Sequence, residues 1–178
     1  GEHCGLYAQD LRKAFYMVHI DQALSAANLL GIPMCVLKMI RSFYDQNERI
    51  FSFRGCVSKE WTHYRHGLLQ GCPFSPLLIN CVMAVWSRAV ARNSQVTAVG
   101  FLDDRSFWAV GQPQRVATSL EEAANTTAQF DDFFGFVVNE DKCQSAASTP
   151  EARAAIVRYG PASRTVTLLG LDMNLENP

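Results

Sequence analysis

The sequence lacks several features that would place it in a common class of protein. No apolar run approaches the ~18 residues that a membrane span requires, so we expect no membrane contact. The formal net charge is only −1 over 178 residues, which argues against a strongly basic nucleic-acid binder, although local clusters such as Arg12-Lys13 remain. There is no internal repeat and no low-complexity tract. The remaining composition, 48% hydrophobic, suits one domain with one sizeable core.

The six cysteines also lack a pattern. They form no CxxC pair and show no regular spacing with the four histidines. We therefore expect free, mostly buried thiols in a reducing compartment, and an intracellular protein of the nucleus or cytoplasm that is not secreted. Residues 1–5 contain no basic segment, no apolar signal core and no initiator methionine, so we expect the chain to be an excerpt of a longer one.

Apolar periodicity predicts a mixed pattern of strands and helices, typical of an α+β domain. Glycine and proline interrupt regular structure over residues 67–76, and Ser75 is positioned to cap the helix that follows. The small, polar stretch Ser145–Glu151 has the composition of a linker. The expected strands are 6–11, 49–53, 57–64, 136–138, 155–159 and 165–169, and the expected helices are 20–30, 36–44, 76–91 and 114–134.

The most informative segment is Gly100-Phe101-Leu102-Asp103-Asp104, where two adjacent carboxylates interrupt an apolar stretch. Strand-like sequence on both sides predicts that the two acids lie at the tip of a hairpin. Aspartate is also favoured in ordinary tight turns, so the pair alone does not decide its role. A second pair, Asp131-Asp132, falls near the end of a predicted helix between Phe130 and Phe133, where we expect both carboxylates to be solvated.

Asp10 supplies a third carboxylate, because it ends an apolar strand that can lie beside the predicted hairpin. Three converging carboxylates repel one another unless cations lie between them, and oxygen ligands of this kind suit Mg²⁺ or Mn²⁺. Two such ions ~4 Å apart can clamp the attacking and leaving oxygens of a phosphoryl transfer. Ordinary explanations exist for each piece: Asp10 as a cap, Gln70-Gly71 as a loop, and Lys142 as a solvated surface lysine.

The order of these segments resembles the palm of a reverse transcriptase, over nearly the whole chain. QGCPFSPLLIN is close to QGCPLSPLLF, and DLRKAF to DLxKAF, in enzymes of retrotransposons without long terminal repeats. The enzymes of group II introns are related by the same motifs. The segments that carry the resemblance are Asp10–Phe15, Gly67–Pro76, Phe101–Asp104, Gly135–Asn139 with Lys142, and Leu168–Gly170.

The resemblance implies a polymerase palm: an antiparallel sheet with a catalytic hairpin, helices packed on one face, and partial fingers inserted at about residues 19–70 of a single domain spanning 1–178. The N-terminal fingers and C-terminal thumb of the family would lie outside this chain, as would any endonuclease domain. The implied function is an RNA-directed DNA polymerase that adds dNTPs to a primer 3′ end on an RNA or DNA template. Two Mg²⁺ ions, or Mn²⁺ in their place, would serve as cofactors.

The resemblance also implies residue roles. Asp10, Asp103 and Asp104, with the carbonyl oxygen of Leu11, would hold the metal ions, and Lys142 would act as general acid toward the departing pyrophosphate. Phe15 would exclude the ribose 2′-hydroxyl by steric contact, and residues 168–173 would begin the strand pair that grips the primer end. The other residues expected to contact substrate are Leu11, Arg12, Lys13, Ala14, Gln70, Gly71 and Pro73.

One departure from the family pattern keeps alternatives open. Tyr16 stands where the family usually has aspartate after KAF, so any polar contact of that acid is lost or replaced. A decayed palm that only binds, or has no role, is therefore one alternative to an active enzyme. An RNA-dependent RNA polymerase is another, although Phe15 and the QGCP segment disfavour it.

Overall fold

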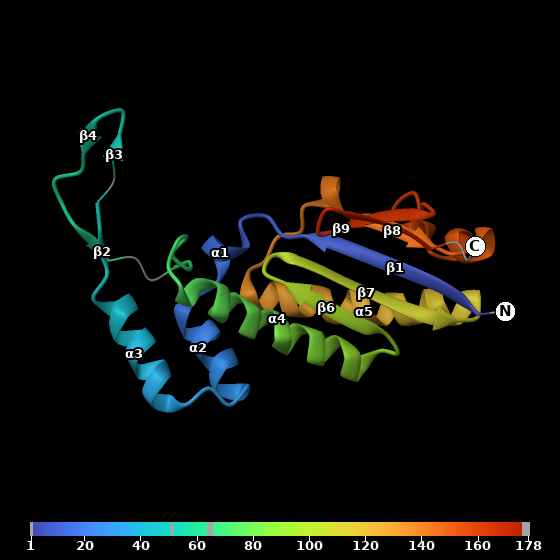
Figure 1. Ribbon diagram of the computed structural model, residues 1–178, viewed down its shortest axis with the longest axis horizontal. Helices are drawn as coiled ribbons and strands as arrows, with labels where there is room; N and C mark the ends of the chain where they lie inside the picture. The colour runs from blue at the N-terminus through green and yellow to red at the C-terminus, as the bar shows by residue number, and fades with distance from the viewer. Residues whose placement is uncertain (1, 51, 64–65, 176–178) are drawn as a thin grey trace.

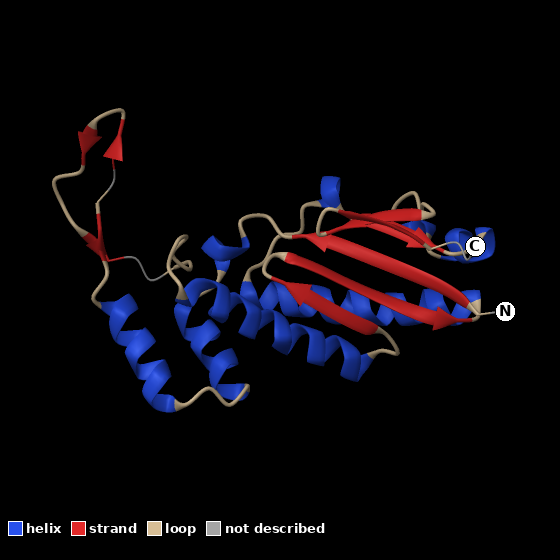
Figure 2. Cartoon of the chain, in the orientation of Figure 1, coloured by secondary structure: helices blue, strands red, loops and turns tan. Residues whose placement is uncertain are grey.

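A computed structural model of the chain, which describes residues 2–50, 52–63 and 66–175, has a four-stranded antiparallel sheet with helices packed on one face (Figures 1 and 2). The strand order is β6-β7-β1-β8, so β1 lies between its partners β7 and β8 although the three are far apart in sequence. The α+β fold class is therefore confirmed. The strands of this sheet are β1 (His3–Asp10), β6 (Thr97–Phe101), β7 (Asp104–Gly111) and β8 (Gln144–Ala147).

Side chains on the two central strands alternate between the faces of the sheet, as strand geometry requires. On one face of the sheet, which we call the helix face, Phe107 is fully buried in a cluster with residues of α4 (Phe74–Asn93) and α5 (Pro113–Phe134). On the other face, Leu6 packs against Val166 of β9 (Thr165–Leu168). Figure 1 shows α4 and α5 running along the same side of the sheet.

Helix α4 is the central core helix. Within the described residues, it alone has the length and apolar composition of a membrane span. Buried apolar residues of its N-terminal half belong to one core cluster, and Trp86 and Val90 of its C-terminal half belong to a second. The buried residues of α4 are Ser75, Leu78, Ile79, Cys81, Val82, Met83, Trp86 and Val90.

Residues between β1 and α4 form helices and a two-stranded arm that extends away from the sheet (Figure 1). The arm turns at Arg54 and Gly55, which both have positive φ (48° and 81°), so the hairpin predicted there is confirmed. Phe51 and Tyr64, which fall in the predicted strands, lie outside the described residues. The elements are α1 (Ala14–Met17), α2 (Ile20–Leu29), α3 (Met34–Asp45), and β2 (Glu48–Arg49), β3 (Ser52–Phe53), β4 (Cys56–Val57) and β5 (Thr62–His63).

The predicted cap of α4 is wrong. The helix begins at Phe74, and Pro73 occupies the capping position without a side-chain bond. Ser75 is buried, and its hydroxyl donates to the carbonyl oxygen of Leu69 at 2.6 Å and lies 3.0 Å from the Tyr44 hydroxyl. Ser75 therefore ties the loop before α4 to helix α3.

Two predictions for the C-terminal part are also wrong. The presumed linker after Gln144 is strand β8 followed by α6 (Pro150–Ala155), whose Thr149 accepts a hydrogen bond from Ala152. Residues 155–159, predicted as a strand, are the end of α6 and a 3₁₀ turn, η2 (Val157–Tyr159). Small side chains explain the first error: Ala146 and Ala147 face opposite clusters and are both fully buried, without the bulk that marks most strands.

The remaining strands are partly as predicted. Residues 136–138 form only a single bridge, between Val138 and Leu11, so the strand predicted there is wrong. β9 confirms the strand predicted over 165–169, and it pairs with β10 (Leu171–Asn174) in an antiparallel hairpin. A 3₁₀ turn, η1 (Glu140–Lys142), precedes β8.

The glycine at position 67 joins two of the recognised motifs. Gly67 donates its N–H to the Val18 carbonyl oxygen at 3.0 Å, and the next residue, Leu68, donates its N–H to the Phe15 carbonyl oxygen at 2.5 Å. Gly67 has φ +82°, and a Cβ there would lie 3.1 Å from Cα of Tyr16. Both the backbone conformation and the close approach therefore require glycine.

A Gly67→Ala substitution should lower the free energy of unfolding by more than Gly31→Ala does. Both glycines have positive φ, which costs an L-residue about 1–2 kcal/mol, but a Cβ at Gly31 would meet nothing within 4 Å. Urea denaturation of the two variants and the parent measures the difference. Equal losses would show that the backbone of Tyr16 moves aside without cost.

Candidate active site

The pairing of β1 with β7 brings the predicted carboxylates together. Asp10 lies directly opposite Asp104 in the register, and Asp103 lies in the turn between β6 and β7. Helix α4 fixes this turn, because the side-chain oxygen of Asn80 accepts a hydrogen bond from the N–H of Leu102 at 3.0 Å. Leu102 itself has φ +57°, a conformation that few residues adopt without such support. The hairpin tip is therefore held in place from the helix.

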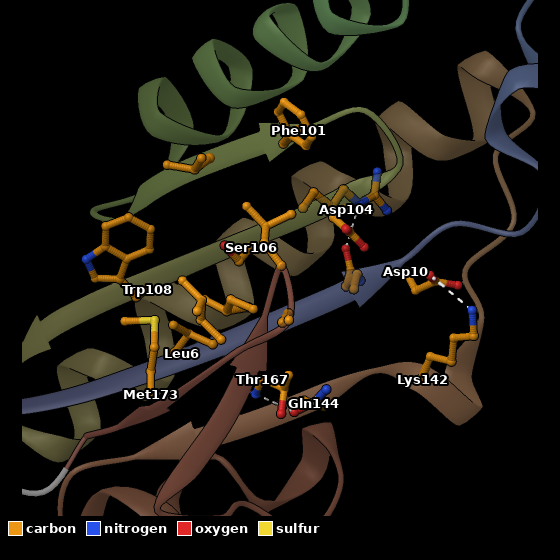
Figure 3. A pocket seen from close by; sticks show the side chains of 18 of the residues that line it. Leu6, Asp10, Phe101, Asp104, Ser106, Trp108, Lys142, Gln144, Thr167 and Met173 are labelled. Atoms are coloured by element: carbon orange, nitrogen blue, oxygen red, sulfur yellow. Dashed lines mark hydrogen bonds and ion pairs between the residues drawn. The ribbon is translucent and has the colours of Figure 1, made fainter. Parts of the chain in front are cut away.

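Asp10 is held by the segment before β8. Asn139 donates its backbone N–H to the Asp10 carbonyl oxygen at 2.8 Å and its side-chain amide to Asp10 Oδ2 at 3.1 Å. Lys142 Nζ lies 3.4 Å from Asp10 Oδ1, an ion pair that Figure 3 shows beside Asp104 of the neighbouring strand. The structure thus brings Lys142 to the carboxylates, and it adds Asn139, to which the sequence analysis gave no role.

The carboxylates repel one another. Burial, followed by the charges of Asp103 and Asp10, raises the pKa of Asp104, while the positive charge of Lys142 lowers it. These interactions require the three acids to be close in space. A cation placed among them would relieve the repulsion.

The oxygen atoms at this site fit a hard divalent cation by their chemistry, since all are carboxylate or carbonyl oxygens. In the part of the chain that the structure describes, however, no three His, Cys, Asp or Glu residues are arranged as a group that could hold a metal ion. The metal assignment therefore stays a prediction.

The expected substrate-binding residues after Asp10 surround the short helix α1. Leu11 and Ala14 are buried, Phe15 is half-buried against the core, and Arg12 and Lys13 are exposed. Lys13 has φ +52°, and Arg12 lies 4.0 Å from Asp141 in an exposed ion pair.

The other expected substrate residues, Gln70, Gly71 and Pro73, lie on the exposed turn that leads into α4. Gly71 has φ +84°, with open space where a Cβ would be. The hydrogen bond from Leu68 to Phe15 joins the segment just before this turn to α1. The roles predicted for these residues remain predictions.

An open cavity of about 920 Å³ lies beside the carboxylates on the face of the sheet opposite α5. Asp10, Asp104 and Lys142 line one part of it, and the β9–β10 hairpin forms a wall (Figure 3). Apolar side chains dominate the rest of the lining, including Leu6, Phe101, Trp108, Leu168 and Met173. The carboxylates therefore face a space large enough for part of a polymeric substrate.

The comparison with known proteins agrees with this geometry. Residues 1–173 match the family of the reverse transcriptase (RNA-dependent DNA polymerase). The chain belongs to this family. The matched residues include every sequence motif on which the resemblance to a reverse transcriptase palm was based.

Solved telomerase structures are similar to this reverse transcriptase domain. Apo telomerase from Candida tropicalis, truncated from its C-terminal domain, has a TM-score of 0.68 and 12% identity over 97% of this chain and 34% of its own. Telomerase from Candida albicans in complex with a fragment of telomeric RNA has a TM-score of 0.63 and 11% identity over 97% of this chain and 29% of its own. At this identity the similarity shows the fold alone, and the reverse transcriptase domain spans about a third of each structure.

The second aspartate pair corrects one prediction. Asp132 is exposed, but Asp131 is buried and accepts two hydrogen bonds from Arg105, one of them at 2.6 Å from Nη1. The expectation that both acids are solvated is therefore wrong for Asp131. The periodicity of α5 explains the difference, since Asp131 falls four residues after buried Thr127 on the side that packs against the sheet.

Removal of one carboxylate should stabilise the metal-free reverse transcriptase domain. The parent loses stability as the pH rises through the raised pKa of Asp104, because burial and the charges of Asp103 and Asp10 disfavour the ionised carboxylate in the folded state. We expect Asp104→Asn to melt at a higher temperature than the parent at pH 7, with the difference shrinking toward the ordinary aspartate pKa of about 3.9.

Thermal melts with a chelator, between pH 4 and 8, measure this effect. Asp132→Asn is the matched control, because it removes one exposed aspartate that is not among the charges acting on Asp104. Melting curves of Asp104→Asn and the parent that run parallel over the whole pH range would contradict the prediction.

Proposed function

We propose that this reverse transcriptase domain is the palm, with partial fingers at about residues 19–70, of an RNA-directed DNA polymerase. The single observation that carries the proposal is the register of β1 with β7, which places Asp10 opposite Asp104 beside an open cavity. The substrates would be an RNA or DNA template, a primer 3′ end and dNTPs. The N-terminal fingers and the C-terminal thumb would come from a longer parent chain.

In this proposal Asp10, Asp103 and Asp104, with the carbonyl oxygen of Leu11, hold two Mg²⁺ ions, or Mn²⁺ in their place. Such ions, when bound, activate the primer hydroxyl and neutralise charge on the leaving pyrophosphate. The protein's part is to hold the ligands, since Asn139 and the β1–β7 pairing fix the position of Asp10 before any ion arrives.

Two kinds of cationic side chain would act on the triphosphate. Lys142 has a 65% exposed side chain at the edge of the cavity, where it can donate a proton to the departing pyrophosphate. Arg12 and Lys13 are exposed close to Asp10 and can contact phosphate oxygens, because the ion pair of Arg12 with Asp141 is long and solvent-exposed. Gln70, Gly71 and Pro73 would contact the nucleotide and the template.

The motif strings support a retrotransposon origin, of the type without long terminal repeats. QGCPFSPLLIN and DLRKAF carry this part of the proposal. The unpatterned cysteines are the basis for proposing an intracellular location in the nucleus or cytoplasm. Tyr16, at the position where the family usually has aspartate, is 47% exposed, so its ring leaves the core packing of α1 unaffected.

Primer extension tests the proposed function. The parent chain should extend a DNA primer on an RNA template with dNTPs and Mg²⁺ or Mn²⁺, and Asp103→Asn should reduce extension by at least ~100-fold, because an amide cannot replace a metal-binding carboxylate. Asp132→Asn, which changes an exposed acid that does not line the cavity, should extend like the parent.

Three outcomes of this assay are informative. Extension that prefers ribonucleotides would favour an RNA-dependent RNA polymerase. Extension unaffected by Asp103→Asn would contradict the site assignment. No extension by a folded parent chain would favour a palm that depends on its missing parts or has lost activity.

Sugar selectivity tests the role of Phe15. Its ring is half-buried on α1, two residues from exposed Lys13, and its backbone is fixed by Leu68. Shortening the side chain in Phe15→Val should admit ribonucleotides, raising the ratio of ribonucleotide to deoxynucleotide incorporation about 10-fold or more, within the range that one steric contact provides. Single-nucleotide incorporation with dGTP and GTP measures the ratio. An unchanged ratio would refute the role of Phe15.

A further inference from the structure

We propose that the buried pair of Arg105 and Asp131 positions the carboxylates of the site. The pair locks the register of β1 and β7 from the helix face, and so holds Asp10 opposite Asp104 on the cavity face. What those carboxylates do rests on the proposed function, whereas their positioning does not. Arg105 and Asp131 are positioning residues, because the Arg105 side chain is fully buried although the residue borders the cavity, and Asp131 does not line the cavity.

The contacts of Arg105 fix its guanidinium in one orientation. Its side chain is 0% exposed. Nη1 donates to Asp131 Oδ1 at 2.6 Å, Nη2 donates to Oδ2, and Nε donates to Gln9 Oε1 at 2.8 Å. Bidentate pairing of arginine with a carboxylate is directional as well as strong. One side chain of β7 is thereby tied both to helix α5 and to strand β1.

The two strand residues in this network are the sequence neighbours of the carboxylates. Gln9 precedes Asp10, Arg105 follows Asp104, and Gln9 and Arg105 are themselves opposite in the register. Because side chains alternate along a strand, residues on the helix face fix their neighbours on the cavity face. A slip of one residue would turn Arg105 toward the cavity and Asp104 into the apolar core. The ion pair therefore opposes that slip.

Helix α4 extends the network. The Arg105 guanidinium lies 5.3 Å from the centre of the Trp86 ring, and Trp86 Nε1 donates to Thr127 Oγ1 at 3.1 Å. Thr127 and Asp131 lie one turn apart on α5. Both helices that cover the sheet thus contact Arg105, near the beginning of β7.

Stability alone does not account for this pair. Removing two charges from water is costly, and well-packed apolar residues of similar volume commonly stabilise a protein as well or better. An apolar pair would still favour the register that buries it, but it lacks the directional hydrogen bonds that join Arg105 to both Gln9 and Asp131. The specific contribution of Arg105 and Asp131 is therefore geometric.

The test compares an apolar replacement with the charged pair. The double variant Arg105→Met/Asp131→Leu should keep a melting temperature near that of the parent, whereas Asp131→Asn, which leaves Arg105 buried and unpaired, should melt much lower. Despite its stability, the double variant should bind Mn²⁺ ~10–100-fold more weakly than the parent, the usual effect of losing a group that orients metal ligands. Electron paramagnetic resonance of free Mn²⁺ measures the affinity, with Asp132→Asn as the control that should match the parent.

A merely structural role gives a different result. If the double variant has parent-like stability and parent-like Mn²⁺ affinity, the inference is overturned. If the double variant does not fold, Arg105→Lys takes its place, because lysine keeps the positive charge but cannot form the bidentate pair. Its Mn²⁺ affinity is then measured 10 °C or more below its melting temperature. Unchanged affinity in that folded variant overturns the inference as well.

Failure of the proposed function is distinguishable from failure of this inference. A parent chain whose Mn²⁺ affinity equals that of Asp103→Asn would contradict the proposed metal site. Amide hydrogen exchange in the metal-free protein then decides the positioning role: the double variant should exchange at least 10-fold faster at residues 102–106 while the amides of α4 exchange as in the parent. Equal exchange rates at residues 102–106 in the double variant and the parent would overturn the inference, whatever the chemistry at the site.

Discussion

The antiparallel pairing of β1 with β7 is the interaction on which the rest of the structure depends. It joins residues about 100 positions apart in the sequence and runs the full length of both strands, from His3 opposite Gly111 to Asp10 opposite Asp104. Because side chains alternate, this one register decides both faces at once. It sends Phe107 into the core with the helices, and it opens Trp108 and Asp104 toward the cavity.

The two faces have opposite energetic roles. The helix face is apolar and closely packed, and it supplies the burial that drives folding. The cavity face holds carboxylates, and burial together with the charges of Asp103 and Asp10 raises the pKa of Asp104, an effect that the charge of Lys142 offsets only in part. The same strands thus carry a stable face and an unfavourable one, as is common where a site is arranged for function.

The sequence predicted the parts of the fold with strong local patterns. The strand ending at Asp10, the hairpin bearing Asp103 and Asp104, and the long helix after Pro113 all follow apolar periodicity or turn chemistry. The parts that it did not predict depend on distant contacts. β8 ends in small residues that are buried because neighbours cover both of its faces. Asn80 accepts from the Leu102 N–H and Asn139 donates to the Asp10 carboxylate, and no local pattern identifies either contact.

The buried state of Asp131 could have been predicted, and the reason is instructive. Its position continues a stripe of α5 at spacings of three and four residues, although flanking Phe130 and Phe133 suggested another side of the helix. An acid on a buried stripe requires a cation in the core, since an unpaired buried carboxylate is very costly. Among the described residues of β7, Arg105 is the one charged residue on the helix face. The alternation along β7 and the helical periodicity of α5 together therefore predict that Arg105 pairs with Asp131. The stripe consists of Val116, Leu120, Ala123, Thr127, Asp131 and Phe134.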